Sequence, residues 1–289
     1  MDARTRIEQA LAAAIADAEG PLCPPRLATA IRYAVFPGGA RIRPQLVLAV
    51  AHACGDDVPA ATDAAAASIE LLHCASLVHD DLPCFDDAAI RRGKPSVHRA
   101  FGERLAVLAG DALIVLAFET LARGVATVPG RLAQLLLIVG RSVGMTDGII
   151  AGQAWECEPR IVLADYHRAK TAALFAAATA AGAAAAGVDA EPWRGFGERL
   201  GEAYQIADDI RDVAATTEDL GKPIGQDQAH DRPSAARELG VHGALVRLEA
   251  LVNDAVTSIP LCPGADDLRK LIRAEVLRLL PEELSQRVA

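Results

Sequence analysis

Helix-forming patterns dominate this sequence, and they restrict the chain to an all-α fold. About a fifth of its 289 residues are alanine, the residue with the highest helix propensity. Apolar residues recur at three- and four-residue steps, as at Leu245, Leu248 and Leu251, whereas the alternating runs typical of strands are nearly absent. We therefore expect a single all-α domain over residues 1–289, built from closely packed helices.

The charge balance and the apolar runs exclude several classes of protein. With 38 acidic and 29 basic side chains the net charge is -9, which argues against a nucleic-acid partner because such partners are bound by neutralising phosphates. The apolar run Ala172–Val188 is shorter than the roughly 20 residues of a membrane span, so we expect a buried helix there and no membrane span. The N-terminal segment carries acids and resembles no export signal. The six cysteines show no metal-ligand spacing and are expected as free thiols in the cytoplasm.

The first of two aspartate clusters follows an apolar helical run and contains Asp80, Asp81, Asp86 and Asp87. Two like charges 4 Å apart repel by about 1 kcal/mol even in water, so the cluster calls for a cation. Hard oxygen ligands favour Mg²⁺, which shares its coordination with water and substrate phosphates. A solvated acidic helix end is an equally good interpretation of this segment taken alone.

The second cluster comprises Asp208, Asp209 and Asp212. On a helix Asp208 and Asp212 are four residues apart and share one face, with Asp209 beside them. A short acidic string of this kind also arises by chance. Two such strings on two apolar helices are much less readily explained that way.

Arginine pairs supply the complementary charge. Arg41 and Arg43 follow the diglycine Gly38-Gly39, and Arg91-Arg92 follows the first aspartate cluster. The forked guanidinium donors suit phosphate oxygens, although either pair alone is also compatible with ordinary surface charge. Taken together, the carboxylates and arginines predict a cavity that binds diphosphates partly through Mg²⁺ and partly through arginine.

The sequence resembles the trans-isoprenyl diphosphate synthases, also called polyprenyl synthetases. The resemblance is carried by FPGGARIRP (36–44), HCASLVHDDLPCFDDAAIRRGKPSVHRAFGE (73–103), LAGDAL (108–113), GQAWE (152–156), KTAALF (170–175), YQIADDIRD (204–212) and GKPIGQD (221–227). Within the family it is most similar to bacterial geranylgeranyl diphosphate synthases of carotenoid and other pigment pathways. The resemblance implies a bundle of helices around a central cavity, usually in a homodimer.

The resemblance also implies a reaction and a role for each motif residue. Isopentenyl diphosphate is condensed with an allylic diphosphate to make geranylgeranyl diphosphate, with Mg²⁺ (three ions) as cofactor. The implied metal ligands are Asp80, Asp86 and Asp208, supported by Asp81 and Asp212, with Asp209 in the same catalytic cluster. Allylic diphosphate is held by Arg91, Lys170 and Lys222, isopentenyl diphosphate by Arg43, His73 and Arg92, and dipoles at Thr171 and Gln205 stabilise the allylic cation. Without the motif match, His73 would be interpreted as a core histidine, and His98 is expected to be structural.

Two positions depart from the family pattern, which usually has lysine where this chain has Ala40 and Gln226. Our hypothesis is that Arg41, Arg43 and Arg92 compensate for the missing amine at position 40. Lost phosphate contacts would also suit a non-catalytic partner subunit of a prenyl synthase, although the intact aspartate clusters weigh against it.

Product length is expected to depend on the residues that precede Asp80 on its helix. Ala75 and Ser76 stand five and four positions before it, and both are small, so they leave room for a twenty-carbon chain. Phe118 or Leu72 would then close the path. The alternatives are a farnesyl diphosphate synthase and a terpene cyclase of the same all-α fold, which would need no isopentenyl diphosphate.

Overall fold

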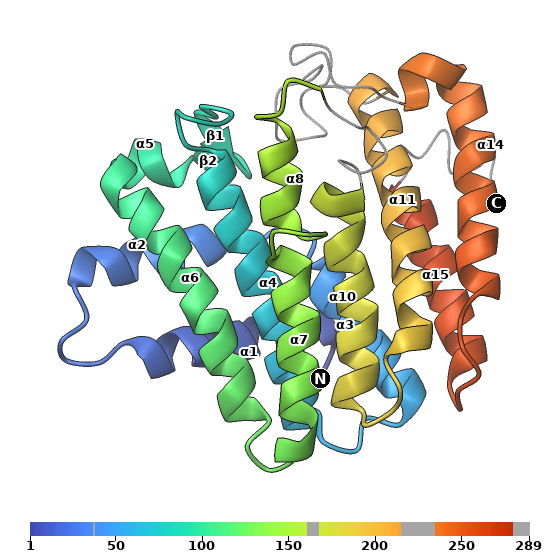
Figure 1. Cartoon of the computed structure of the whole chain (residues 1–289), viewed down its shortest axis with the longest axis horizontal. Coiled ribbons are helices and arrows are strands. Elements are labelled where there is room, and N and C mark those ends of the chain that lie inside the picture. Colours follow the sequence, from blue (N-terminus) through green and yellow to red (C-terminus); the bar gives the residue numbers. More distant parts are fainter. Residues whose placement is uncertain (37, 161–167, 215–234, 280–289) are drawn as a thin grey trace. The chain divides into compact units, whose positions relative to one another are not determined.

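The structure is a computed structural model that describes residues 1–36, 38–160, 168–214 and 235–279. Apart from one short hairpin, its described secondary structure is helical, which confirms the all-α prediction (Figure 1). The chain divides into two compact units, one of Met1–Gly140 with Ala181–Asp189 and one of Arg141–Ala180 with Ala190–Ala289. We describe each unit by itself, and the single domain over 1–289 stays a prediction.

The first unit is built around α4 (Pro59–Asp80). The elements of this unit are α1 (Ala3–Ala18), α2 (Pro25–Val35), α3 (Ile42–Cys54), α4, β1 (Ile90–Arg91), β2 (Lys94–Pro95), α5 (Val97–Phe101), α6 (Glu103–Gly124), the 3-10 turn η1 (Pro129–Arg131) and most of α7 (Leu132–Val143). Helices α1, α2, α3 and α6 all pack against α4. The small residues of α4 permit this, since a side chain at Gly124 of α6 would lie 2.2 Å from Cβ of Ala64. The core is therefore centred on the helix that leads to the first aspartate cluster.

Local sequence signals set the ends of these helices. Asp2 caps α1, because its carboxylate accepts the amide hydrogen of Thr5 at 2.9 Å. Proline occupies the first turn of α2 and of α4, where its missing amide hydrogen costs nothing. Gly55 ends α3 with a left-handed φ of 117°, a conformation that glycine adopts without strain.

The strands β1 and β2 form an antiparallel hairpin in which Arg91 lies opposite Lys94. The two turn residues, Arg92 and Gly93, have φ of 53° and 75°. Two consecutive positive φ angles are the signature of a type I′ turn, whose twist matches that of a hairpin. Arginine is an uncommon residue in such a turn, so the position of Arg92 has a local conformational cost.

The second unit is centred on α11 (Glu191–Ala214). Its described elements are the end of α7, α8 (Ile149–Trp155), the π-helical turn η2 (Arg168–Ala172), α10 (Ala173–Ala185) as far as Ala180, α11, α14 (Ala235–Thr257) and α15 (Ala265–Leu279). Helix α11 packs against η2, α14 and α15. A side chain at Gly197 of α11 would lie 2.6 Å from the carbonyl oxygen of Phe175, so glycine permits the close approach of α10.

Two apolar helices, α10 and α6, differ in how deeply they are buried. Residues 174–186 are buried, which confirms the expected buried helix except at its end, where Gly187 and Val188 are exposed and lie beyond α10. Among the described residues, α6 alone is long and apolar enough to cross a membrane by length and composition, with 39% of its apolar window buried. One face of α6 packs on α4, and the helix carries Asp111 and Glu119 among its apolar residues.

Candidate functional site

The chain folds back on itself directly after α4. The amide of Asp86 donates to the carbonyl oxygen of Asp80 at 2.9 Å, and the amide of Asp87 donates to Leu82 at 3.1 Å. This turn returns the last aspartate of the DDxxxxD string to the end of the helix that carries the first. Asp80 and Asp86 are both half-buried, so the described structure places two carboxylate-bearing residues next to each other at the rim of the first unit.

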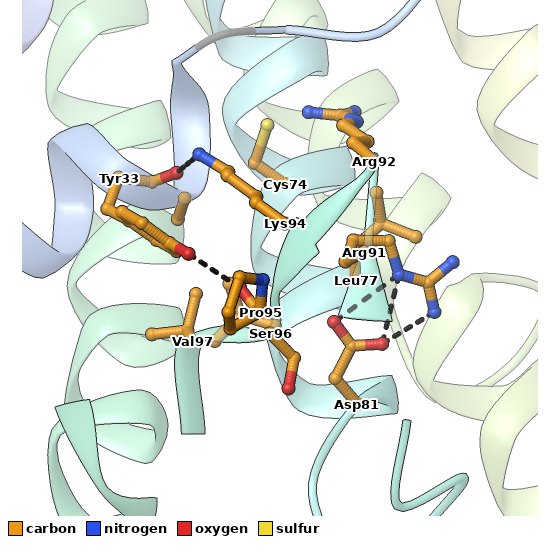
Figure 2. A pocket seen from close by; sticks show the side chains of 12 residues that line it. Tyr33, Cys74, Leu77, Asp81, Arg91, Arg92, Lys94, Pro95, Ser96 and Val97 are labelled. Atoms are coloured by element: carbon orange, nitrogen blue, oxygen red, sulfur yellow. Dashed lines mark hydrogen bonds and ion pairs between the residues drawn. The ribbon is translucent and has the colours of Figure 1, made fainter. Parts of the chain in front are cut away.

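Asp81, between them, lies inward and is 1% exposed. Nε and Nη2 of Arg91 donate to its Oδ1 at 3.0 and 2.6 Å (Figure 2). Burial raises the pKa of the Asp81 carboxyl above its usual value, although the hydrogen bonds from Arg91 oppose this change. A buried pair of this kind fixes the direction of both side chains, since removing either leaves an uncompensated charge. Asp81 therefore orients Arg91 in this structure.

The three residues expected to hold isopentenyl diphosphate are brought together in the first unit. Arg43 of α3 places Nη1 3.5 Å from Nε2 of His73 on α4. Loss of solvation, followed by the charges of Arg43 and Arg92, lowers the pKa of His73 well below its usual value. His73 is thus held neutral among cations, and its Nε2 is placed to accept a hydrogen bond from Arg43. This positive environment suits an anionic ligand.

The arginine at the tip of the hairpin reaches the same region. Nη2 of Arg92 lies 3.9 Å from Oε1 of Glu70 on α4. A side chain at Gly39 would place its Cβ 3.2 Å from Nε of Arg92, so the diglycine loop and the hairpin tip lie in contact. The diglycine therefore permits the close approach of Arg92.

Arg41 does not take the part that our hypothesis gave it. Its side chain is 0% exposed, Nη1 donates to Glu70 at 2.6 Å and Nε donates to Glu8 of α1 at 2.9 Å. Nη2 donates to the carbonyl oxygen of Val35 at 2.8 Å. The guanidinium is committed to joining α1, α2 and α4, and the hypothesis about Ala40 is left with Arg43 and Arg92. Glu70, an acid within the apolar run of α4, was the sequence signal for a buried partner, and it was missed.

In the second unit, a chain of hydrogen bonds joins η2 to α11. Oγ1 of Thr171 donates to Oε1 of Gln205 at 2.8 Å, and Nε2 of Gln205 donates to Oδ1 of Asp209 at 2.9 Å. Asp209 is buried, and Asp208 beside it is half-buried. These bonds fix the amide of Gln205, so the hydroxyl of Thr171 and the oxygen of Gln205 have defined positions at the aspartate-bearing end of α11.

Lys170 forms an ion pair with Glu156 in the same unit. A side chain at Gly152 of α8 would lie 2.7 Å from the backbone nitrogen of Lys170, so α8 and η2 approach closely at this point. Glu156 was not among the predicted residues, although it ends the quoted GQAWE motif. The backbone of Asp212 lies in α11, and its side chain is outside the described structure. Lys222 and Gln226 also lie outside the described residues.

The donor set fits Mg²⁺ without forming a closed metal site. Within residues 1–36, 38–160, 168–214 and 235–279, no three His, Cys, Asp or Glu side chains are grouped closely enough to hold a metal ion. Asp80, Asp86 and Asp208 offer half-buried carboxylates, the hard ligands that Mg²⁺ prefers when water and phosphate complete its coordination. In each unit taken by itself, these carboxylates suit an ion whose coordination a diphosphate completes.

The two residues expected to set product length lie on α4. Ala75 is buried, and Oγ of Ser76 donates to the carbonyl oxygen of His73 at 2.9 Å. Leu72 is buried on the same helix, and Phe118 is half-buried on α6, which packs along α4. His98 is buried, with Nδ1 3.0 Å from Oγ of Ser96, in agreement with its expected structural place.

Comparison with known proteins identifies close relatives. A family profile described as polyprenyl synthetase matches residues 24–244. The chain is 58% identical over 283 residues to a geranylgeranyl diphosphate synthase of Cereibacter sphaeroides, covering 98% of each chain. It is 54% identical over 268 residues to one of Rhodobacter capsulatus, covering 93% of each. Its structure matches a geranyltransferase from Helicobacter pylori, complexed with magnesium and isoprenyl diphosphate, at a TM-score of 0.80 and 30% identity, covering 95% of this chain and 96% of that one.

Proposed function

The chain belongs to the polyprenyl synthetase family, and we propose that it is an Mg²⁺-dependent prenyltransferase that makes geranylgeranyl diphosphate from isopentenyl diphosphate and allylic diphosphates. The identity of 58% to a synthase of that name supports the product. The observation that carries the chemistry is the position of Arg43, His73 and Arg92 in the same unit as the carboxylates at the end of α4.

The aspartates form the metal-binding part of the proposed site. Asp80, Asp86 and Asp208 would hold Mg²⁺, with Asp81 and Asp212 in support and three ions in the complete complex. Bound Mg²⁺ supplies Lewis-acid neutralisation of the charge that develops on the leaving diphosphate. Asp81 has a second task in the proposal, because its hydrogen bonds aim Arg91.

The cationic side chains divide between the two substrates. Arg91, Lys170 and Lys222 bind the allylic diphosphate, and Arg43, His73 and Arg92 bind isopentenyl diphosphate. When the allylic carbon–oxygen bond breaks, the isopentenyl double bond attacks the allylic cation and a proton leaves the new chain. The oxygens of Thr171 and Gln205 stabilise the cation, and the hydrogen bond from Gln205 to Asp209 keeps them in place. Apolar walls exclude the water that would trap the cation.

The small side chains of Ala75 and Ser76 are proposed to admit the growing chain as far as twenty carbons. Replacing Ala75 with Tyr should shorten the main product to fifteen carbons, because the phenol ring would fill the path beside α4. Chromatography of the dephosphorylated products measures this. An unchanged twenty-carbon product from Ala75→Tyr would contradict the assignment.

One experiment tests the function and its rivals. The purified protein is incubated with Mg²⁺, isopentenyl diphosphate and, separately, the allylic diphosphates of five, ten and fifteen carbons. A twenty-carbon product is expected. Products that stop at fifteen carbons would identify a farnesyl diphosphate synthase, and consumption of an allylic diphosphate alone would identify a cyclase. No turnover would favour a non-catalytic partner subunit.

We also propose that the protein is a homodimer. Helix α6 carries Val107, Leu108 and Val115, which are 41%, 53% and 57% exposed in this chain. Large apolar side chains exposed on one helix, here with the exposed Asp111 among them, are suited to burial against a second copy. Sedimentation velocity of the purified protein measures the assembly directly.

A further inference from the structure

Helix α2 ends with carbonyl groups that the helix itself cannot satisfy. The residue four positions after Tyr33 is a proline, which has no amide hydrogen and so cannot donate to the Tyr33 carbonyl. Nζ of Lys94 fills this place, donating to the carbonyl oxygen of Tyr33 at 2.5 Å (Figure 2). It also donates to the carbonyl oxygen of Phe36 at 2.7 Å. A cation at the C-terminal end of a helix is also favoured by the helix dipole. Lys94 therefore caps α2 from a different element, the strand β2.

Tyr33 completes a two-way connection between the helix and the strand. The ring of Tyr33 lies under the ammonium group, with Nζ 3.8 Å from the ring centroid, and its hydroxyl donates to the carbonyl oxygen of Pro95 at 2.8 Å. Desolvation, followed by the charge of Arg92, lowers the pKa of Lys94. The lysine is thus held partly buried near another cation. Its hydrogen bonds to α2 compensate for the cost of desolvating the ammonium group and of its repulsion by Arg92.

The residue that this connection places is Arg92. It stands two positions before Lys94, in the type I′ turn, with a left-handed φ of 53° that is strained for arginine. Its guanidinium lies against Gly39 and 3.9 Å from Glu70. Because Lys94 is the first residue of β2 after the turn, a shift of β2 away from α2 moves Arg92 away from both neighbours.

Arg91, on the other strand of the hairpin, has a separate support. Its side chain is aimed by the two hydrogen bonds to Asp81. The hairpin therefore carries two arginines with independent anchors, one through Asp81 and one through Lys94.

We propose that Lys94 is a positioning residue for isopentenyl diphosphate: it ties β2 to the open end of α2 and so holds Arg92 in the place where that substrate is bound. The inference rests on the proposed function, which assigns Arg92 to isopentenyl diphosphate and Arg91 to the allylic diphosphate. The proposal predicts that loss of Lys94 weakens the binding of isopentenyl diphosphate, through Arg92, and leaves the binding of the allylic diphosphate, through Arg91, unchanged.

The test compares Lys94→Met with Lys94→Arg, whose guanidinium can again donate to the carbonyls of α2. For Lys94→Met we expect a roughly tenfold higher KM for isopentenyl diphosphate, the size of typical losses when the support of a ligand is removed. The KM for the allylic diphosphate and kcat should stay within about twofold of the unmodified protein. Lys94→Arg should restore most of the isopentenyl affinity. Thermal unfolding of each variant reports any general loss of stability.

A double-mutant cycle separates positioning from general disruption. If Lys94 acts through Arg92, the Lys94→Met and Arg92→Ala changes combined should raise the isopentenyl KM no further than Arg92→Ala alone. Additive effects, an equal rise in both KM values, or an unchanged isopentenyl KM in Lys94→Met would each overturn the proposal.

Calorimetric binding of isopentenyl diphosphate, without an allylic substrate, distinguishes this proposal from the proposed function. If the unmodified protein shows no turnover but Lys94→Met binds isopentenyl diphosphate more weakly than it does, the positioning role is supported and the enzymatic function is contradicted. If the unmodified protein shows normal turnover and Lys94→Met binds isopentenyl diphosphate as tightly as it does, the positioning role alone is overturned. No binding of isopentenyl diphosphate to the unmodified protein would overturn both.

Discussion

The two aspartate-bearing regions are organised by different forces. Along α4 and just after it, charged side chains are partly or fully buried and paired, as in Arg41 with Glu70 in the middle of the helix and Asp81 with Arg91 after its end. At the η2 end of α11, a hydrogen-bonded relay of Thr171, Gln205 and Asp209 links a hydroxyl and an amide to a single carboxylate. Buried ion pairs are costly to break and fix direction, whereas in the relay a carboxylate holds an amide whose oxygen in turn accepts from a neutral hydroxyl, so the groups that it orients are dipoles. The first region is thus suited to aiming cations at diphosphates, and the second to presenting oxygens to a developing cation.

The largest expected effect tests whether both regions serve one reaction. Asp80→Asn and Asp208→Asn should each lower kcat by roughly a thousandfold or more, because each removes a proposed ligand of the ion that neutralises the leaving group. Steady-state assays at saturating Mg²⁺ measure this. The control is Asp87→Asn, a neighbouring exposed carboxylate that contacts Arg99 and should retain most activity. A loss confined to one of the two aspartates would show that only one region binds the catalytic metal.

The next effect tests the buried charges of the first region. Arg41→Met leaves Glu70, which is 2% exposed, without its closest cation and should lower the free energy of unfolding by about 3–5 kcal/mol. Urea denaturation gives the value. Arg32→Met removes a surface pair with Glu19, in which the arginine is 44% exposed, and should cost under about 1 kcal/mol. Equal losses would mean that burial does not distinguish the two arginines.

A smaller effect tests the relay of the second region. Thr171→Val removes one hydroxyl and should lower kcat about tenfold, the kinetic equivalent of one hydrogen bond, with little change in the melting temperature. Thr179→Val offers the matched control, because that hydroxyl is buried and donates to the carbonyl oxygen of Trp193 at 2.8 Å. It should lower stability and leave kcat nearly unchanged. If Thr171→Val lowered stability and left kcat unchanged, the relay would serve folding alone.

The smallest expected effect is a pH dependence from His73. Its pKa is lowered in the folded protein, so below pH ~6.5 the unfolded chain binds a proton that the folded chain does not, and stability falls as the pH falls. One such proton contributes a slope of at most about 1.4 kcal/mol per pH unit. Urea denaturation at several pH values between 5 and 7.5 should therefore show a shallower decline for His73→Gln than for the unmodified protein. Parallel curves would contradict the neutral state of His73 in the folded protein.

Most of the fold class was predictable because helix formation and burial leave periodic marks in a sequence. Most of the apolar run at Ala172–Val188 was correctly predicted to be a buried helix, which ends at Ala185, since alanine-rich segments have high helix propensity and small residues pack closely. The division into two compact units was not predicted. No change of composition marks it, and helix α10 runs across it, so only the contacts among helices show where it lies.

The sequence by itself determined which residues we propose to carry the chemistry. Asp208 stands in a string whose spacing follows helix geometry, and Asp80 begins a string that continues into the turn after α4, so a local pattern is enough to propose both. Only the tertiary structure decided between chemically identical side chains. Arg41 and Arg92 belong to similar pairs, yet Arg41 forms ion pairs with Glu8 and Glu70 in the core. Arg92 lies against the diglycine loop, at the tip of a hairpin that Lys94 bonds to α2. The physical reason is that burial and charge pairing depend on partners distant in sequence, which spacing along the chain cannot reveal.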